Sequence, residues 1–84
     1  MIDSLPFSPI SIEIAPKRFR TIDSVAQAAD FLLAGWEGRE KGSAYRIALR
    51  RCLAALEGRI KPESARAAFL EALREARIFV RTRE

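Results

Sequence analysis

The sequence predicts a small α+β domain in the order ββαααβ, with a two- or three-stranded, mostly antiparallel sheet and three helices packed on one of its faces. Three observations predict this class. Isoleucines alternate with polar residues near the amino terminus, as in a strand with one buried face. Apolar residues then recur with helical spacing in three successive stretches. A short β-branched and aromatic run, IFVRT, follows the last of these stretches.

The first two strands are predicted from the segment SPISIEIAPKRFRTI. Its Ala-Pro-Lys tripeptide forms the turn, because proline presets φ and cannot donate a hydrogen bond to a strand ladder. The chain then returns as a second strand, with Phe19 and Thr21 on one face. The isoleucines expected on the buried face of the first strand are Ile10, Ile12 and Ile14.

A first helix is predicted to begin after Ser24, because Ser24 and Gln27 have the spacing of a capping box. Phe31 lies off the apolar stripe of this helix, and we expect it to be either a flank contact or a partly exposed aromatic. The stripe itself consists of Val25, Ala28, Ala29, Leu32 and Trp36.

Two further helices follow. The second is expected from Ser43 to Glu57, because Gly58 can adopt the left-handed conformation that ends helices. The third begins at Pro62, since proline is tolerated in the first turn. Expected inward residues are Tyr45, Ala48, Leu49, Cys52 and Leu56 on the second helix, and Ala65, Phe69, Ala72, Leu73 and Ala76 on the third. The last strand is predicted over Ile78 to Thr82.

Composition indicates one domain over residues 1–84, with residues 1–8 as a flexible amino-terminal arm. An acid stands among the first residues, where a secretory signal would carry bases, and no stretch approaches the ~20 apolar residues of a membrane span. The single cysteine, Cys52, excludes an intramolecular disulfide. We therefore expect a cytoplasmic protein that does not bind membranes.

The chain contains no histidine, which removes the commonest metal ligand and the side chain best suited to proton transfer near neutral pH. Cys52 lies in the middle of a predicted helix among leucines, so we expect it to be buried and unreactive. The carboxylates are scattered and suggest no acid–base pair. The sequence therefore predicts no catalytic residues, no metal site and no cofactor.

Basic residues gather around the second helix. Residues 43–61 contain five basic residues and one acid, a net charge of +4 that equals the formal charge of the whole chain. Such a surface could follow a phosphate backbone. It could equally be the solvated side of a core helix, paired with acids of the third helix such as Glu71 or Glu75. The candidate contact residues for a nucleic acid or another partner are Arg46, Arg50, Arg51, Arg59 and Lys61.

Two other routes to nucleic acid are weaker. Ala54 and Gly58 have the spacing of a helix-turn-helix, but Ser64 stands at an apolar position of that motif and Pro62 at the start of its recognition helix. The second route is the face of the sheet that the helices leave open. If Ile78 and Val80 face inward, the outward residues are Phe79 and Arg81, beside Arg18 and Arg20. The same face could instead meet a second subunit, with Phe31 or Phe79 as exposed apolar residues.

The segments YRIALRRCLAALEG and ESARAAFLEALREARIFV, together with an alanine-rich helix ending in Trp36, resemble the domain-of-unknown-function family 982, small proteins of rhizobia and other alphaproteobacteria. The resemblance covers nearly the whole chain after the hairpin. It implies a compact single domain with no established activity and no catalytic residues. Two positions depart from the pattern. Glu37 replaces an expected proline, and Arg77 replaces an expected glycine before the last strand.

The function expected from these observations is that of a small non-enzymatic domain, a protein-interaction or regulatory module whose partner is unknown and which we also expect to form a homodimer. The alternative is a nucleic-acid-binding module that uses the basic second helix.

Overall fold

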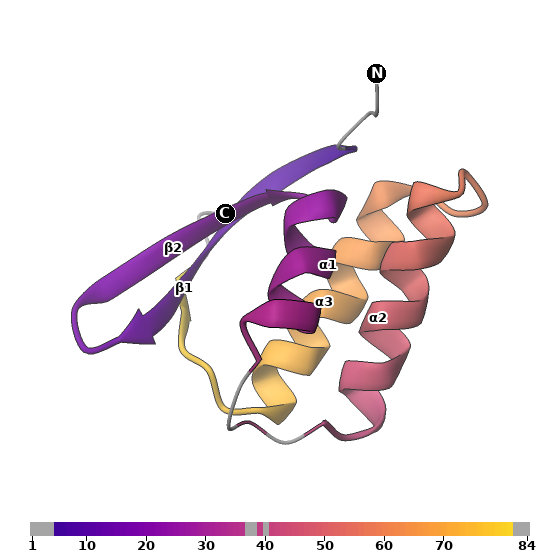
Figure 1. Ribbon diagram of the computed structural model, residues 1–84. Helices are drawn as coiled ribbons and strands as arrows, with labels where there is room; N and C mark the ends of the chain where they lie inside the picture. Colours follow the sequence, from indigo (N-terminus) through magenta and orange to yellow (C-terminus); the bar gives the residue numbers. More distant parts are fainter. Residues whose placement is uncertain (1–4, 37–38, 40, 82–84) are drawn as a thin grey trace.

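Three antiparallel strands and three helices follow one another in the predicted order ββαααβ in the computed structural model, which describes residues 5–36, 39 and 41–81. The fold is α+β, with strand order β2-β1-β3 and the helices on one side of the sheet (Figure 1). The elements are β1 (Pro6–Ala15), β2 (Arg18–Ser24), α1 (Val25–Ala34), α2 (Ser43–Leu56), α3 (Pro62–Glu75) and β3 (Val80–Arg81).

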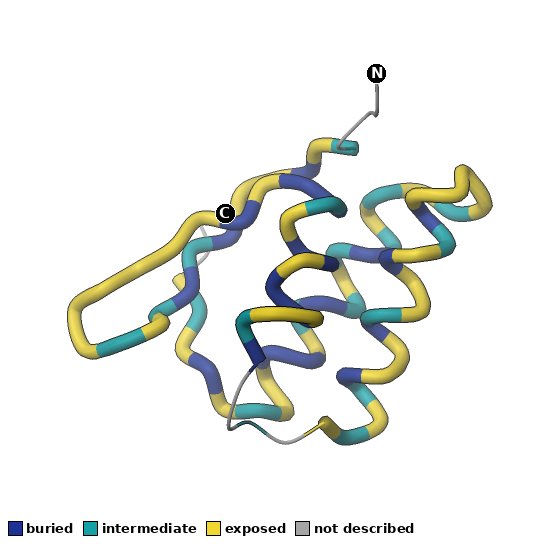
Figure 2. Tube along the Cα trace, in the orientation of Figure 1, coloured by how far each residue is buried: buried dark blue, intermediate teal, exposed yellow. Residues whose placement is uncertain are grey.

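The β1–β2 hairpin buries one face at its centre and projects beyond the helices at its tip (Figure 2). Ile10 pairs with Ile22, and Ile10, Ile12 and Ile22 are all fully buried. The expectation for Ile14 was wrong, because this side chain is 40% exposed. The register shifts between Glu13 and Ala15, which breaks the alternation just where the hairpin leaves the helix layer.

Part of the predicted amino-terminal arm belongs to this hairpin. β1 already begins at Pro6, and the backbone N–H of Val25 donates a hydrogen bond to the carbonyl of Leu5 at 3.0 Å. Residues 1–4 of the arm lie outside the described residues.

The start of α1 follows the predicted capping pattern with one difference. The hydroxyl of Ser24 accepts a hydrogen bond from the backbone N–H of Gln27 at 3.1 Å, as expected. The side-chain oxygen of Gln27 accepts from the N–H of Asp23 at 2.8 Å, one residue before the cap. All five stripe residues of this helix are buried, including Trp36 just beyond its end.

Phe31 is buried rather than partly exposed, so it is a flank contact. Its side chain is only 2% exposed because elements distant in the sequence close over it. Its ring meets Trp36 at 5.7 Å and Phe69 at 6.2 Å between centroids, both edge to face. The guanidinium of Arg20 lies 5.8 Å from the centre of the same ring.

Helix α2 buries a slightly different stripe from the predicted one. Tyr45, Ala48 and Cys52 are buried, but the fourth position is Ala55, and Leu56 is exposed. The buried arc of α2 therefore runs through Ala48, Cys52 and Ala55, and Leu56 lies outside it. Gly58 ends the segment with φ +80°, as expected.

The amino terminus of α2 is capped from a distant element. Its N-cap residue is Gly42, which has no side chain to accept a hydrogen bond. The carboxylate of Glu75, at the end of α3, instead accepts from the N–H groups of Ala44 and Tyr45, both at 3.4 Å. A Cβ atom on Gly42 would stand 2.7 Å from that carboxylate, so a larger residue here would push the Glu75 side chain away from its capping position. The negative charge also suits the positive end of the helix dipole.

The last strand begins later than predicted. β3 spans Val80–Arg81 and pairs with β1, while buried Ile78 belongs to the preceding connection and Thr82 lies outside the described residues. That connection turns at Arg77, whose φ of 60° is left-handed. This explains why the resemblance leads one to expect glycine there. The other departure, Glu37, lies outside the described residues.

We predict that Arg77→Gly raises the free energy of unfolding by roughly 0.5–1 kcal/mol, because the left-handed conformation costs a non-glycine residue more than glycine loses in unfolded-chain entropy. Urea denaturation monitored by circular dichroism measures the change. Gly58→Ala is the matched control, because nothing lies within 4 Å of its added Cβ and the left-handed strain alone should destabilise the fold by about 1 kcal/mol. A destabilised Arg77→Gly protein would contradict the assigned backbone conformation.

Candidate interaction surfaces

The face of the sheet turned away from the helices carries the most distinctive exposed surface. Phe19 on β2 lies opposite Glu13 on β1 in the register, and the N–H of Glu13 donates a hydrogen bond to the carbonyl of Phe79 at 3.0 Å. Side chains from β1, β2 and the segment that leads into β3 therefore lie next to one another. We call this surface the open sheet face; its residues are Ser11, Glu13, Phe19, Thr21, Phe79 and Arg81. The expected placement of Phe19 with Thr21, and of Phe79 with Arg81, is confirmed.

The open sheet face has an aromatic centre. The rings of Phe19 and Phe79 meet edge to face at 6.4 Å, although 39% and 58% of these residues remain exposed. The guanidinium of Arg81 lies over Phe19, 4.7 Å from the ring centroid. Two phenylalanines in contact with each other and with water form an apolar patch rather than isolated surface residues.

Opposite charges flank this aromatic centre. One carboxylate oxygen of Glu13 accepts a hydrogen bond from the backbone N–H of Lys17 at 3.1 Å. Within residues 5–36, 39 and 41–81, neither Glu13 nor Arg81 forms an ion pair. The patch therefore combines one anion and one cation that remain available to a partner.

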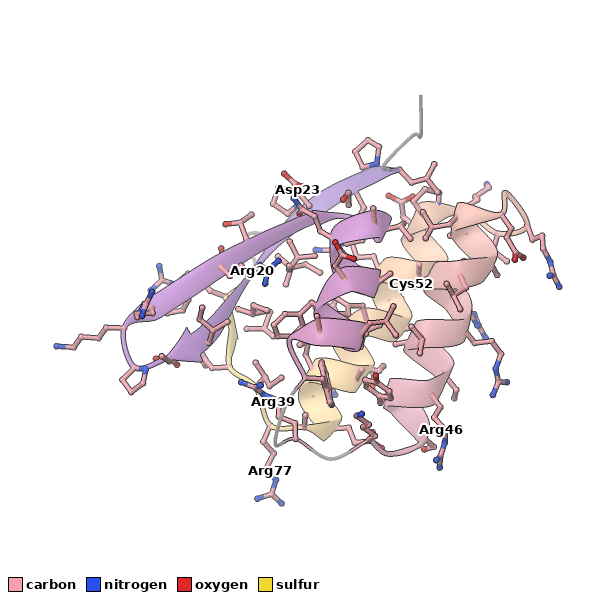
Figure 3. The ribbon with its side chains drawn as sticks, in the orientation of Figure 1. Arg20, Asp23, Arg39, Arg46, Cys52 and Arg77 are labelled. Carbon is pink, nitrogen blue, oxygen red and sulfur yellow. The ribbon has the colours of Figure 1, made fainter. Side chains whose placement is uncertain are left out.

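Arg20 does not belong to this face, which corrects its expected place beside Phe79. It lies opposite Ile12 in the register, so its side chain leaves the sheet on the covered side. Figure 3 shows it between the sheet and α1, where its guanidinium packs over Phe31.

The basic residues around α2 are all exposed, but they do not form one surface. Arg46 and Arg50 are one turn apart on the side of α2 that faces solvent, and Figure 3 shows Arg46 pointing away from the rest of the molecule. Arg51 instead lines the hollow between α2 and α3. Arg59 and Lys61 lie in the connection between these helices.

The acids of α3 do not neutralise α2 in the way we considered from the sequence. Glu71 lies 3.9 Å from Arg74 on its own helix, and Glu75 caps the start of α2. Arg59 pairs with Glu57 at 3.1 Å, but both side chains are largely exposed, so this contact contributes little. Arg46 and Arg50 have no acidic partner in the part of the chain that the structure describes.

The geometry of α2 and α3 does not fit a helix-turn-helix. In that motif the two helices cross at about 90–120°. Here α2 and α3 run antiparallel and side by side (Figure 1). The hollow between them, about 500 Å³, has a floor of small side chains that includes Ala67 and Ala68. The sequence shows that α3 is rich in alanine, but it does not show that Ala67 and Ala68 face outward into this hollow.

Cys52 is fully buried in the core, and burial raises its pKa from 9.0 to about 11 because the thiolate would be desolvated. The described residues contain no cluster of three or more Cys, Asp or Glu side chains that could hold a metal ion, and no helix among them is long and apolar enough to span a bilayer. The expected lack of an activity, a metal and a cofactor remains a prediction.

We predict that a disulfide reagent labels Cys52 slowly in the folded protein at pH 8 and rapidly in urea, because the folded thiol is both inaccessible and protonated. The folded state retains this proton above pH 9 whereas the unfolded state loses it. Stability should therefore fall as the pH rises from about 9 towards 11, by up to roughly 3 kcal/mol relative to a Cys52→Ala control. Rapid labelling of the folded protein would contradict this environment.

Comparison with known proteins identifies the family of this chain. No characterised protein and no solved structure matches the chain significantly. The family model described as "Protein of unknown function (DUF982)" matches residues 8–80, which span β1 to the start of β3. The family resemblance noted in the sequence is thus confirmed over nearly the whole chain, and the protein belongs to the DUF982 family.

Proposed function

We propose that the protein is a non-enzymatic protein-interaction module that binds its partner through the open sheet face. The observation that carries this proposal is the exposed contact between Phe19 and Phe79, with Arg81 packed beside it. Aromatic residues and arginine are enriched in the centres of protein interfaces, where they supply most of the binding energy. Burying these two rings against a partner would remove an apolar patch from water.

The charge and geometry of this patch favour a protein over a single-stranded nucleic acid. Surfaces that bind single strands offer ring faces to bases and cations to phosphates. Here the ring of Phe19 has Arg81 over one face, and its other described aromatic contact is the edge-to-face one with Phe79. Glu13, which pairs with Phe19 in the register, also adds a carboxylate to this face, where it would repel a phosphate backbone.

The proposal includes a cytoplasmic protein without catalytic activity. It is supported by the absence of histidine from the sequence and by the burial of the single cysteine. A regulatory role would follow from whichever protein the open sheet face binds.

The test is site-specific photo-crosslinking in cells of the protein's own organism. We predict that benzoylphenylalanine in place of Phe79 gives discrete protein adducts, because this residue lies in the centre of the proposed interface. The matched control is the same substitution at Leu33, an exposed apolar residue on α1. The proposal fails if position 79 gives no more adduct than position 33, or if its adducts disappear with nuclease rather than with protease.

The second candidate function is nucleic-acid binding through α2. The observation that favours it is the solvent-facing pair Arg46 and Arg50, which has no acidic partner among the described residues, on a helix that contains no acid between Ser43 and Leu56. The guanidinium groups of these two arginines could form hydrogen-bonded ion pairs with phosphates.

For this candidate we predict binding to single- or double-stranded oligonucleotides that weakens by roughly 10–50-fold between 50 and 200 mM salt, as expected for about three phosphate contacts. Arg46→Glu with Arg50→Glu should abolish it. Lys17→Glu with Arg18→Glu makes the same charge change at the hairpin and should have a smaller effect. Fluorescence anisotropy titrations provide the measurement, and absence of binding at 50 mM salt would eliminate the candidate.

A further inference from the structure

The identity of the partner can be inferred from the open sheet face, on the assumption that this face is the binding site proposed above. We propose that the partner is a second copy of this chain, and that two open sheet faces pack against each other around a two-fold axis. Most soluble oligomers are symmetric homo-oligomers, and a two-fold interface requires a surface that is complementary to itself. The open sheet face meets that requirement in its apolar centre and its charges.

The charges provide the strongest argument. An interface with one kind of charge would repel its own copy, whereas the described residues around the two phenylalanines include both an anion, Glu13, and a cation, Arg81. Neither is neutralised by an ion pair within the described chain. In a two-fold dimer, Glu13 of each subunit can meet Arg81 of the other, so that a single type of contact occurs twice.

The structure also favours contact between faces over contact between sheet edges. β2 is an edge strand of seven residues, and pairing of two such strands is the usual alternative for a small sheet. Arg20 lies on the inward side of this edge strand with its guanidinium held over Phe31. An inward-pointing charge on an edge strand discourages addition of another strand, because pairing would bury that charge. The open sheet face has no comparable obstacle.

The size of the face sets the expected affinity. Three strands at a spacing of about 4.8 Å give a contact only about 14 Å wide. An interface of this size lies at the small end of specific protein contacts. We therefore expect a dissociation constant in the range of roughly 10 μM to 1 mM, so the dimer would be missed in dilute solution.

The experiment is a charge exchange followed by sedimentation equilibrium at low salt, over protein concentrations that span this range. Wild-type protein should show a mass that rises from monomer to dimer. Glu13→Arg alone and Arg81→Glu alone should each weaken self-association by at least about tenfold, because each places like charges opposite one another. An equimolar mixture of the two variants should restore dimers, since both contacts are then between opposite charges.

The matched control reverses charges on α3, with Glu71→Arg and Arg74→Glu, and should leave the wild-type dimerisation unchanged. Far-ultraviolet circular dichroism checks that each variant folds, and restoration on mixing itself requires folded chains. A protein that stays monomeric at the highest concentration overturns the inference. So does self-association that the two face variants do not weaken or that their mixture does not restore.

This outcome is distinguishable from failure of the proposed function. Photo-crosslinking from position 79 to a different protein, combined with a monomeric chain, would retain the interaction module and reject the homodimer. A monomeric chain with no protein adduct at position 79 would reject both. Crosslinked species of twice the monomer mass would support both.

Discussion

A continuous series of aromatic contacts holds the three helices in one layer, and the rest of the structure depends on it. Tyr45 on α2 meets Trp36, Trp36 meets Phe31 on α1, and Phe31 meets Phe69 on α3. The hydroxyl of Tyr45 also donates to the carbonyl of Leu32 at 2.6 Å, which satisfies its polar end inside the core. Because the helices are fixed to one another, they cover a single face of the sheet as a unit. In the part of the chain that the structure describes, all three helices lie on this side of the sheet and none covers the other face.

The fold could be predicted where it depends on local patterns. Periods of 3.6 or 2 residues predict the stripe of α1 and the alternation at Ile10 and Ile12. Turn chemistry predicts the end of α2 near Gly58 and the start of α3 at Pro62. The errors occurred where a local pattern meets a tertiary boundary. Ile14 follows the alternation but lies beyond the edge of the helix layer, and Leu56 follows the predicted stripe but is exposed, while Ala55 is buried.

The candidate surfaces were less predictable, because they are made by pairs distant in the sequence. Phe19 and Phe79 meet because β3 pairs with the side of β1 that β2 leaves free. The spacing of apolar residues along the sequence does not reveal which residues face each other across those strands. Glu75 was considered as a partner for arginines, whereas its position at the end of α3 places it against the N–H groups of α2. The residues around α2 were found from composition, but their division between two sides of the helix required the packing.

The described part of β3 links the stability of the open sheet face to that of a local segment. Among the described residues, Phe79 and Arg81 are held against β1 by the pairing of Val80 and Arg81 and by the hydrogen bond from the N–H of Glu13 to the carbonyl of Phe79. Such a segment can detach by local opening at a far smaller free-energy cost than unfolding of the core. A ligand that contacts both Phe19 and Phe79 would have to bind the closed form, and would slow hydrogen exchange at the Glu13 amide. Ligand binding at the open sheet face and pairing of β3 with β1 are therefore coupled. A bound ligand favours the paired strand, and detachment of the strand weakens binding.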